Sequence, residues 1–126
     1  MPPELSVVIP LRDEARNVSP LLEQLTAAIA PLDVPYELIL VDDGSEDDTF
    51  PFLEEAAARD PHVRVIQFTR NFGQTAAFAA GFAQARGRLI VTSDGDLQND
   101  PADIPTLLQF APDHDIVCGW RSGDVW

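Results

Sequence analysis

Two acidic residues one position apart, Asp94 and Asp96, directly follow the apolar run of residues 89–93. Such a run predicts a buried strand, and in open α/β sheets ligands bind in the crevice beyond the carboxyl ends of the strands. Two carboxylates there can converge on a divalent cation, because magnesium needs only one or two of them in addition to substrate phosphates. The same Asp-Gly pair also favours a surface hairpin turn, so the spacing alone leaves both interpretations open.

Two further polar segments follow apolar runs. Asp42 and Asp43 continue the run of residues 36–41, where an unpaired charge would be costly, so we expect them to act as ligands or hydrogen-bond acceptors. Arg12 and Glu14 follow the run of residues 5–10, and Glu14 by itself could be only a solvated loop carboxylate. If the sheet is parallel, these segments and Asp94 all lie at one edge of it. That coincidence indicates a shared site.

The segment of residues 70–74, Arg-Asn-Phe-Gly-Gln, also has the residue types of a binding loop. Arg70 could reach a diphosphate, and Gly73 with the start of the following helix could shape an anion pocket. The alternative is a loop whose Arg70 and Asn71 only tie down neighbouring backbone. The sequence does not decide between the two.

The elements that must position these residues follow from hydrophobic periodicity. Alternating strands and helices predict βαβ units, hence an α/β fold: a mostly parallel sheet with helices on both faces, in a single domain over residues 1–126. Thr49 is expected to cap the second helix and Gly87 to end the third. The predicted strands are residues 5–10, 36–41, 63–68, 88–93 and 115–119, and the predicted helices begin near residue 17, near Thr49, at 75 and at 104.

Composition excludes several classes of protein. With 126 residues, 45% of them hydrophobic, the chain can bury a core, and no apolar run reaches the roughly 18 residues that span a bilayer. A single cysteine, Cys118, excludes an internal disulfide and a cysteine-based zinc cluster, which fits a reducing, cytoplasmic setting.

The charge balance limits the kinds of molecule that the chain can bind. The formal net charge is -13 and the chain contains no lysine, so nucleic acid should be repelled. P-loop and Schiff-base chemistry, which depend on lysine, are excluded as well. A bound anion must therefore be met by arginine, backbone N–H groups, helix N-termini or a metal ion.

Other sites with acidic loops can be tested by spacing. A calcium EF-hand needs glycine at its sixth position, where counting from Asp43 and Asp94 gives Asp48 and Asn99. No Gly-x-Gly-x-x-Gly follows the first predicted strand, so a dinucleotide site is unsupported. A phosphatase with an aspartyl nucleophile remains a rival, although Gln98 stands where that class carries threonine or valine.

Five segments in order make the chain resemble family 2 glycosyltransferases, above all bacterial polyprenyl-phosphate glycosyltransferases and dolichol-phosphate mannose synthases. They are VVIPLRDEARNV, LVDDGSEDDT, FTRNFGQTAAFAAGF, SDGDLQNDPADIP and DIVCGWR. The resemblance implies a GT-A fold, a Rossmann-like sheet that binds a UDP- or GDP-linked sugar together with Mg²⁺ or Mn²⁺. It further implies inverting transfer of the sugar to a polyprenyl phosphate, undecaprenyl or dolichyl. That acceptor is already anionic and needs no general base.

The resemblance also assigns roles to residues. Asp96 would be the main metal ligand, with Asp94 and Gln98 beside it, and Gly95 would complete the D-x-D motif. Arg121 matches an arginine that meets the diphosphate or the acceptor phosphate. The nucleobase and ribose site would be formed by Pro10, Arg12, Glu14, Val41 and Asp43, with Asp42 as a neighbour.

The chain departs from the family pattern in places. Arg12 stands where relatives often carry an aromatic residue, which leaves the base undetermined, and Asp100 replaces a usual proline. Relatives continue past the position of Trp126 with acceptor-binding and membrane-contacting segments. We therefore expect this chain to be the nucleotide-binding part of an enzyme that works at the cytoplasmic face of the membrane. The alternative is a binding module without turnover, and in either case we expect self-association through uncovered apolar surface.

Overall fold

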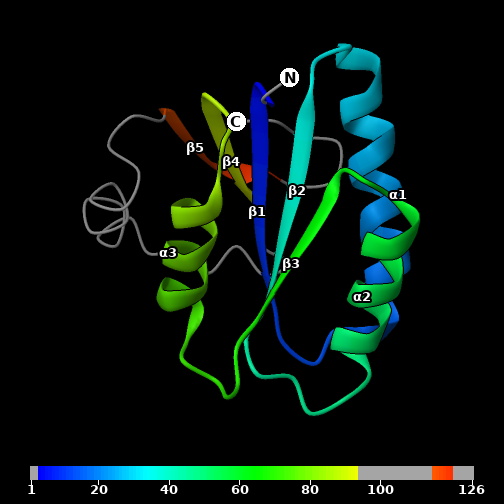
Figure 1. The fold of residues 1–126 in the computed structure, drawn as a ribbon, viewed down its shortest axis with the longest axis vertical. Helices are drawn as coiled ribbons and strands as arrows, with labels where there is room; N and C mark the ends of the chain where they lie inside the picture. The colour runs from blue at the N-terminus through cyan, green and yellow to red at the C-terminus, as the bar shows by residue number, and fades with distance from the viewer. Residues whose placement is uncertain (1–2, 94–114, 121–126) are drawn as a thin grey trace.

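The computed structural model describes residues 3–93 and 115–120, and Figure 1 shows their arrangement. The strands are β1 (Leu5–Leu11), β2 (Tyr36–Asp42), β3 (Val63–Gln67), β4 (Leu89–Ser93) and β5 (Asp115–Trp120). The α-helices are α1 (Val18–Ile29), α2 (Thr49–Arg59) and α3 (Gln74–Gln84), and the short 3₁₀ helices η1 (Ala15–Asn17) and η2 (Ala30–Leu32) flank α1. The predicted helix from residue 104 lies outside the described residues.

The sheet has the order β3-β2-β1-β4-β5, and every neighbouring pair is parallel. This confirms the predicted parallel α/β sheet. The chain builds outward from β1 to β3, then returns to place β4 on the other side of β1. The strand order therefore reverses between β1 and β4, and such a switch point is where open α/β sheets bind ligands.

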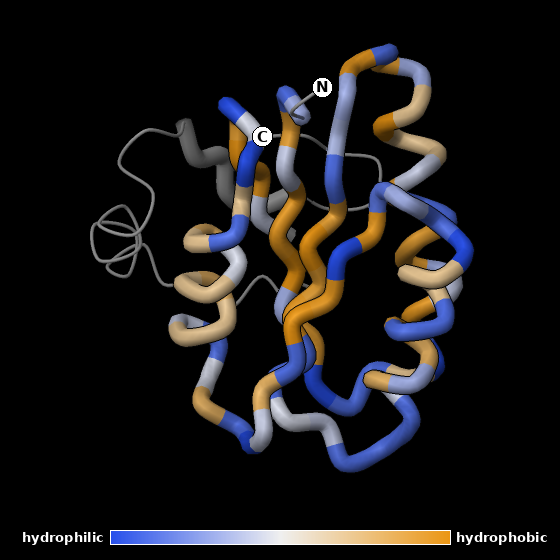
Figure 2. Tube along the Cα trace, viewed as in Figure 1, coloured by the Kyte–Doolittle hydropathy of each residue, from blue (hydrophilic) through white to orange (hydrophobic). Residues whose placement is uncertain are grey.

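The two faces of the sheet follow from alternation along the strands. On β1, Val7 and Ile9 join a core cluster with Leu25 of α1 and Leu53 of α2, whereas Val8 joins a second cluster with residues of α3. Figure 1 accordingly shows α1 and α2 on one side of the sheet and α3 on the other. Figure 2 shows the apolar residues along the strands and polar residues in the loops at the lower end of the view.

Two predicted helix boundaries are wrong. Thr49 is the first residue of α2 rather than its cap; it is fully buried, and its hydroxyl donates to Asp47 of the preceding loop. Helix α3 ends at Gln84, three residues before Gly87. Gly87 is needed for a different reason, because a Cβ there would lie 2.7 Å from the backbone nitrogen of Ser6.

No helix among residues 3–93 and 115–120 is both long and apolar enough to cross a membrane.

Candidate functional site

The candidate site lies at the carboxyl-terminal edge of the sheet, at the lower end of Figure 1. There the loops that follow β1, β2 and β3 lie side by side. Hydrogen bonds between residues far apart in the sequence join these loops. The loops thus form one platform. It carries Arg12, Glu14, Asp43 and Arg70, whereas Pro10 and Val41 lie within β1 and β2.

The loop after β1 is tied to the loop after β2 by reciprocal bonds. The Asp13 N–H donates to Ser45 Oγ (2.9 Å), and the Glu46 N–H donates to Asp13 Oδ1 (2.8 Å). The Glu14 N–H donates to Thr49 Oγ1 (2.8 Å). Asp13 adopts a left-handed backbone (φ 53°), which aspartate tolerates better than most residues. These bonds fix the backbone on which Arg12 and Glu14 are presented.

Asp47 contributes to the same junction. Its carboxylate accepts from the Thr49 hydroxyl, from the Thr49 N–H and from the Ala15 N–H of the neighbouring loop. The Thr49 hydroxyl does most to lower the pKa of Asp47 below its ordinary value. Asp47 is therefore ionised at neutral pH and binds the start of α2 to the β1 loop.

Asp43 links the loop after β2 to the loop after β3. Its side chain, 5% exposed, accepts from the Phe72 N–H (2.8 Å), the Gly73 N–H (3.1 Å) and the Asn71 side-chain amide (3.0 Å). The expected hydrogen-bonding role of the buried Asp43 is confirmed by these bonds. Asp42 is buried as well, and its Oδ1 accepts from the Ser45 N–H (3.1 Å).

Gly44 allows this contact between loops to be close. Its φ is +70°, and a Cβ at this position would lie 2.2 Å from the Arg70 carbonyl carbon and 2.4 Å from the Asn71 nitrogen. A side chain at position 44 would displace that backbone. The loops after β2 and β3 are therefore in van der Waals contact through their main chains.

Arg70 is exposed and lies with its guanidinium carbon 4.6 Å from the centre of the Phe72 ring. Phe72, half exposed, meets Phe68 edge to face at 5.5 Å between ring centres. Arg70 makes no ion pair with any residue in the described part of the chain. An exposed arginine held on an aromatic ring at this edge is able to meet an anion.

The other residues predicted to form the nucleotide site differ in their exposure and in their contacts. Arg12 is exposed and weakly paired with Asp13 (4.0 Å), and Glu14 is half-buried and accepts from Asn17 Nδ2 (2.6 Å). Pro10 is half-buried near the end of β1 and pairs in register with Val41. The Val41 side chain is fully buried in the core beside α3, so only its main chain could contact a nucleotide.

The predicted metal ligands Asp94, Asp96 and Gln98, together with Gly95 and Arg121, lie outside the described residues. Strand β4 runs parallel to β1, pairs Thr92 with Val8, and ends at Ser93, one residue before Asp94. The donor set consists of two carboxylates and an amide oxygen, which suits a hard divalent cation. Within residues 3–93, no group of three His, Cys, Asp or Glu side chains offers an alternative metal site.

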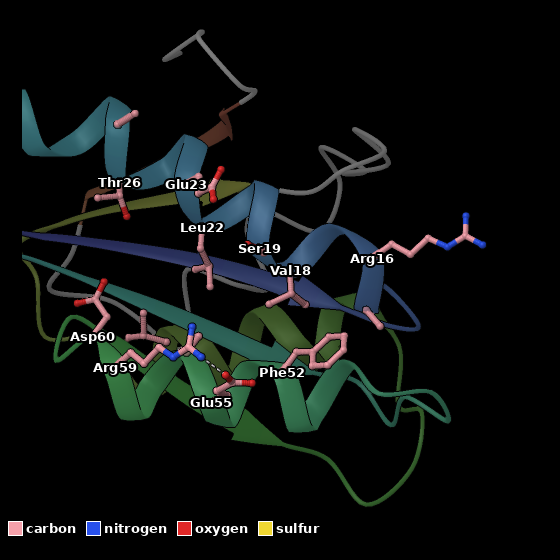
Figure 3. A pocket seen from close by; sticks show the side chains of 14 residues that line it. Arg16, Val18, Ser19, Leu22, Glu23, Thr26, Phe52, Glu55, Arg59 and Asp60 are labelled. Carbon is pink, nitrogen blue, oxygen red and sulfur yellow. Dashed lines mark hydrogen bonds and ion pairs between the residues drawn. The ribbon is translucent and has the colours of Figure 1, made fainter.

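A separate open groove of about 800 Å³ lies between α1 and α2, and Ala15 of the β1 loop lines it (Figure 3). Leu22 and the exposed Phe52 contribute apolar surface, while Arg59 pairs with Glu55 across one turn of α2. No residue that the sequence predicted for nucleotide binding lines this groove.

Sequence reasoning missed three residues that join the loops, namely Asp13, Ser45 and Asp47. For Asn71 it left two alternatives open, and the bonds from the Asn71 amide to Asp43 agree with the one in which Asn71 ties down neighbouring backbone. The partners of these residues are mostly about 30 residues away in the chain, so no local spacing marks them. The one available signal was the concentration of short polar side chains, which favour turns, directly after each predicted strand.

Comparison with known proteins identifies the family. The model of "Glycosyl transferase family 2" matches residues 6–125. The chain is 47% identical over 121 residues to a dodecaprenyl-phosphate galacturonate synthase from Rhizobium johnstonii, covering 94% of the chain and 36% of that protein. It is 46% identical over 120 residues to an undecaprenyl-phosphate 4-deoxy-4-formamido-L-arabinose transferase from Pseudomonas fluorescens, covering 94% and 35%. The chain thus spans about a third of the length of these relatives.

Solved structures agree with the fold. A mannosyltransferase from Pyrobaculum calidifontis in complex with GDP-Man and Mn²⁺ superimposes with a TM-score of 0.63 at 25% identity, over 76% of this chain and 28% of that one. TarS from S. aureus in complex with UDP-GlcNAc gives a TM-score of 0.62 at 27% identity, over 74% and 26%. These matches confirm the predicted GT-A fold. Fold, ordered motifs and family match therefore agree that the chain belongs to glycosyltransferase family 2.

Proposed function

We propose that this chain is the nucleotide-sugar-binding domain of a metal-dependent, inverting glycosyltransferase that moves a sugar from a UDP- or GDP-linked donor to a polyprenyl phosphate. The observation that carries the proposal is the platform of three joined loops at the switch-point edge of the sheet. The named activities of the relatives, a galacturonate synthase and an arabinose-derivative transferase acting on polyprenyl phosphates, support the acceptor class.

Each predicted residue has a role in this proposal. Pro10, Arg12, Glu14, the Val41 main chain and Asp43 surround the nucleobase and ribose. Arg70 and Arg121 meet the diphosphate or the acceptor phosphate, since arginine can bind phosphate oxygens in bidentate fashion. Asp94, Asp96 and Gln98 would hold Mg²⁺ or Mn²⁺, and Gly95 completes the D-x-D motif. When bound, such a cation neutralises charge on the departing nucleoside diphosphate.

Catalysis would rest on positioning and electrostatics. The acceptor phosphate is anionic at neutral pH, so it can attack the anomeric carbon without a general base. The protein has to hold donor and acceptor in line and shield two anions from each other, contributions that are large when the groups are preorganised. The arginines are the only permanent cations that this lysine-free chain can supply.

A nucleotide-sugar-binding module without turnover is the second candidate, because the chain spans about a third of its relatives' length. Transfer of labelled sugar to polyprenyl phosphate, measured on this chain, separates the two functions. Transfer would favour the glycosyltransferase, and nucleotide binding without transfer would favour the binding module. We further propose that the enzyme works at the cytoplasmic face of the membrane.

The proposal is tested by calorimetry with UDP and GDP, in MnCl₂ and in chelator. We expect binding only with metal, because the acidic edge repels a bare diphosphate. Asp96→Asn should weaken binding about tenfold or more by removing one ligand charge. Asp33→Asn is the matched control, since exposed Asp33 lies beyond α1 in a left-handed conformation that asparagine tolerates. Equal affinity in chelator, or equal losses in both variants, would contradict the assignment.

A further inference from the structure

The loop after β3 is anchored more firmly than its exposure suggests. Asn71 and Phe72 are exposed, yet residues 71, 72 and 73 each donate to the carboxylate of the buried Asp43. A carboxylate has about four acceptor positions, and three are occupied by this one loop. Asp43 therefore has a task besides any contact with a nucleobase.

Asn71 supplies the one side chain among those three donors. Its Nδ2 lies 3.0 Å from Asp43 Oδ2 and 3.4 Å from the Asp43 carbonyl oxygen, so it contacts both the side chain and the main chain of Asp43. The Gly73 N–H donates to the same Oδ2 (3.1 Å). Asn71 thus fixes the orientation of the carboxylate as well as the course of its own loop.

The same loop carries Arg70, the residue directly before Asn71. The Arg70 main chain lies against Gly44 so closely that no Cβ would fit there, and its guanidinium lies over the Phe72 ring. Rotation of the loop would therefore move the guanidinium. Arg70 has no ion pair among the described residues, although the neighbouring loops are rich in carboxylates, so its charge is free for an anion.

We propose that Asn71 is a positioning residue: together with Asp43 it holds the loop of residues 70–73 so that the Arg70 guanidinium meets the diphosphate of the nucleotide. This inference rests on the proposed function. Asp43 then serves two parts of the ligand. The family resemblance places its carboxylate at the nucleobase, and the same carboxylate fixes the loop that carries Arg70.

A double-mutant cycle on nucleotide binding tests the inference. Affinity for UDP and GDP in MnCl₂ is measured for Asn71→Ala, Arg70→Ala and the double variant. We expect losses of about fivefold and about tenfold for the single variants. If Asn71 acts through Arg70, the double variant should bind no more weakly than Arg70→Ala. Gln24→Ala, which truncates an exposed amide on α1, is the control and should bind normally.

Amide hydrogen exchange gives a readout that does not depend on ligand. The Phe72 and Gly73 N–H groups should exchange about tenfold faster in Asn71→Ala, because the Asp43 carboxylate that they bond to is no longer fixed. They should be unchanged in Arg70→Ala. Asn71→Asp, which sets one carboxylate against another, should weaken binding more than Asn71→Ala does.

The outcomes separate the inference from the proposed function. If the unaltered chain binds neither nucleotide in MnCl₂, the proposed function fails and the inference falls with it. If the unaltered chain binds but the two single losses multiply in the double variant, only the inference is overturned. Unchanged exchange at Phe72 and Gly73 in Asn71→Ala would also overturn it.

Discussion

At the scale of single residues, Glu37 shows how this acidic chain makes use of a buried charge. Its side chain is 2% exposed at the start of β2, opposite the candidate site. It accepts from Ser6 Oγ (2.6 Å), from the Arg86 N–H (2.8 Å) and from the guanidinium groups of Arg64 and Arg86 (2.8 and 3.1 Å). Burial by itself would raise the pKa of Glu37, but these hydrogen bonds outweigh it and lower the pKa below its ordinary value.

Because the pKa of Glu37 is lowered in the folded chain, the free energy of unfolding depends on pH. The folded chain binds fewer protons at Glu37 than the unfolded chain, so the stabilisation is fully present above the ordinary pKa of 4.5. It is lost as pH falls through the lower folded value. Glu37→Gln should reduce the free energy of unfolding at neutral pH by about 2–3 kcal/mol and should flatten its decline in acid.

Urea denaturation of the unaltered chain and of Glu37→Gln between about pH 3 and pH 7 measures this effect. Glu4→Gln is the control, because Glu4 is exposed and pairs only loosely with Arg88 at 3.5 Å. A Glu37→Gln variant that keeps the full acid sensitivity of the unaltered chain would show that other carboxylates cause it.

At the scale of elements, the close approach of α3 to the sheet depends on Gly81. A Cβ at this position would lie 2.2 Å from Val8 Cγ1 and 3.3 Å from Val8 Cβ. Glycine at this position thus lets the helix backbone approach β1, and Phe78 and Phe82 of α3 pack in the same core cluster as Val8. The packing of α3 matters for the site, because the loop of residues 70–73 leads directly into this helix.

Gly81→Ala should therefore destabilise the fold although alanine is the better helix former. Helix propensity favours alanine by about 1 kcal/mol, while overpacking costs about 1–3 kcal/mol, so we expect a net loss near 1 kcal/mol. In a Val8→Ala background the clashing methyl group is gone, and the same change should become neutral or stabilising. Thermal denaturation of the unaltered chain, the two single variants and the double variant measures this. Equal effects of Gly81→Ala with Val8 and with Ala at position 8 would contradict the packing argument.

At the scale of the whole molecule, charge is the dominant feature. A formal net charge of -13 on 126 residues implies self-repulsion in the folded state. The ion pairs of the described residues are mostly exposed, and such pairs contribute little. Screening of the charges by salt should therefore reduce the repulsion by more than it reduces the attraction.

Raising NaCl from about 10 mM to about 300 mM shortens the Debye length from about 30 Å to below 10 Å. We expect the melting temperature to rise by a few degrees, measured with chelator present so that metal binding does not contribute. Choline chloride should act like NaCl if the effect is screening. A fall in melting temperature would show that attractive pairs, above all those of Glu37, outweigh the net repulsion.

The sequence by itself determined the α/β class, the parallel sheet, the strand positions to within one or two residues, and the family. These follow from signals that are local in the chain. Apolar runs mark buried strands, helical spacing marks the helices, and short motifs such as the residues around Asp43 and Arg70 occur in a set order. The expectation that Asp42 and Asp43 would be bonded followed from the cost of burying a charge, which is also a local argument.

Only the tertiary structure decided which residues join the loops. Asp43 bonds to residues 28–30 positions away, and Gly44 touches the backbone of Arg70, because the order β3-β2-β1 sets these strand ends side by side. The same holds for Glu37 and Arg86, which are 49 positions apart. Even the mistaken assignment of Gly87 has this cause, since the need for glycine comes from the backbone of Ser6 in β1, which is 81 positions away. Spacing along a chain does not encode such contacts, because they depend on which strands become neighbours.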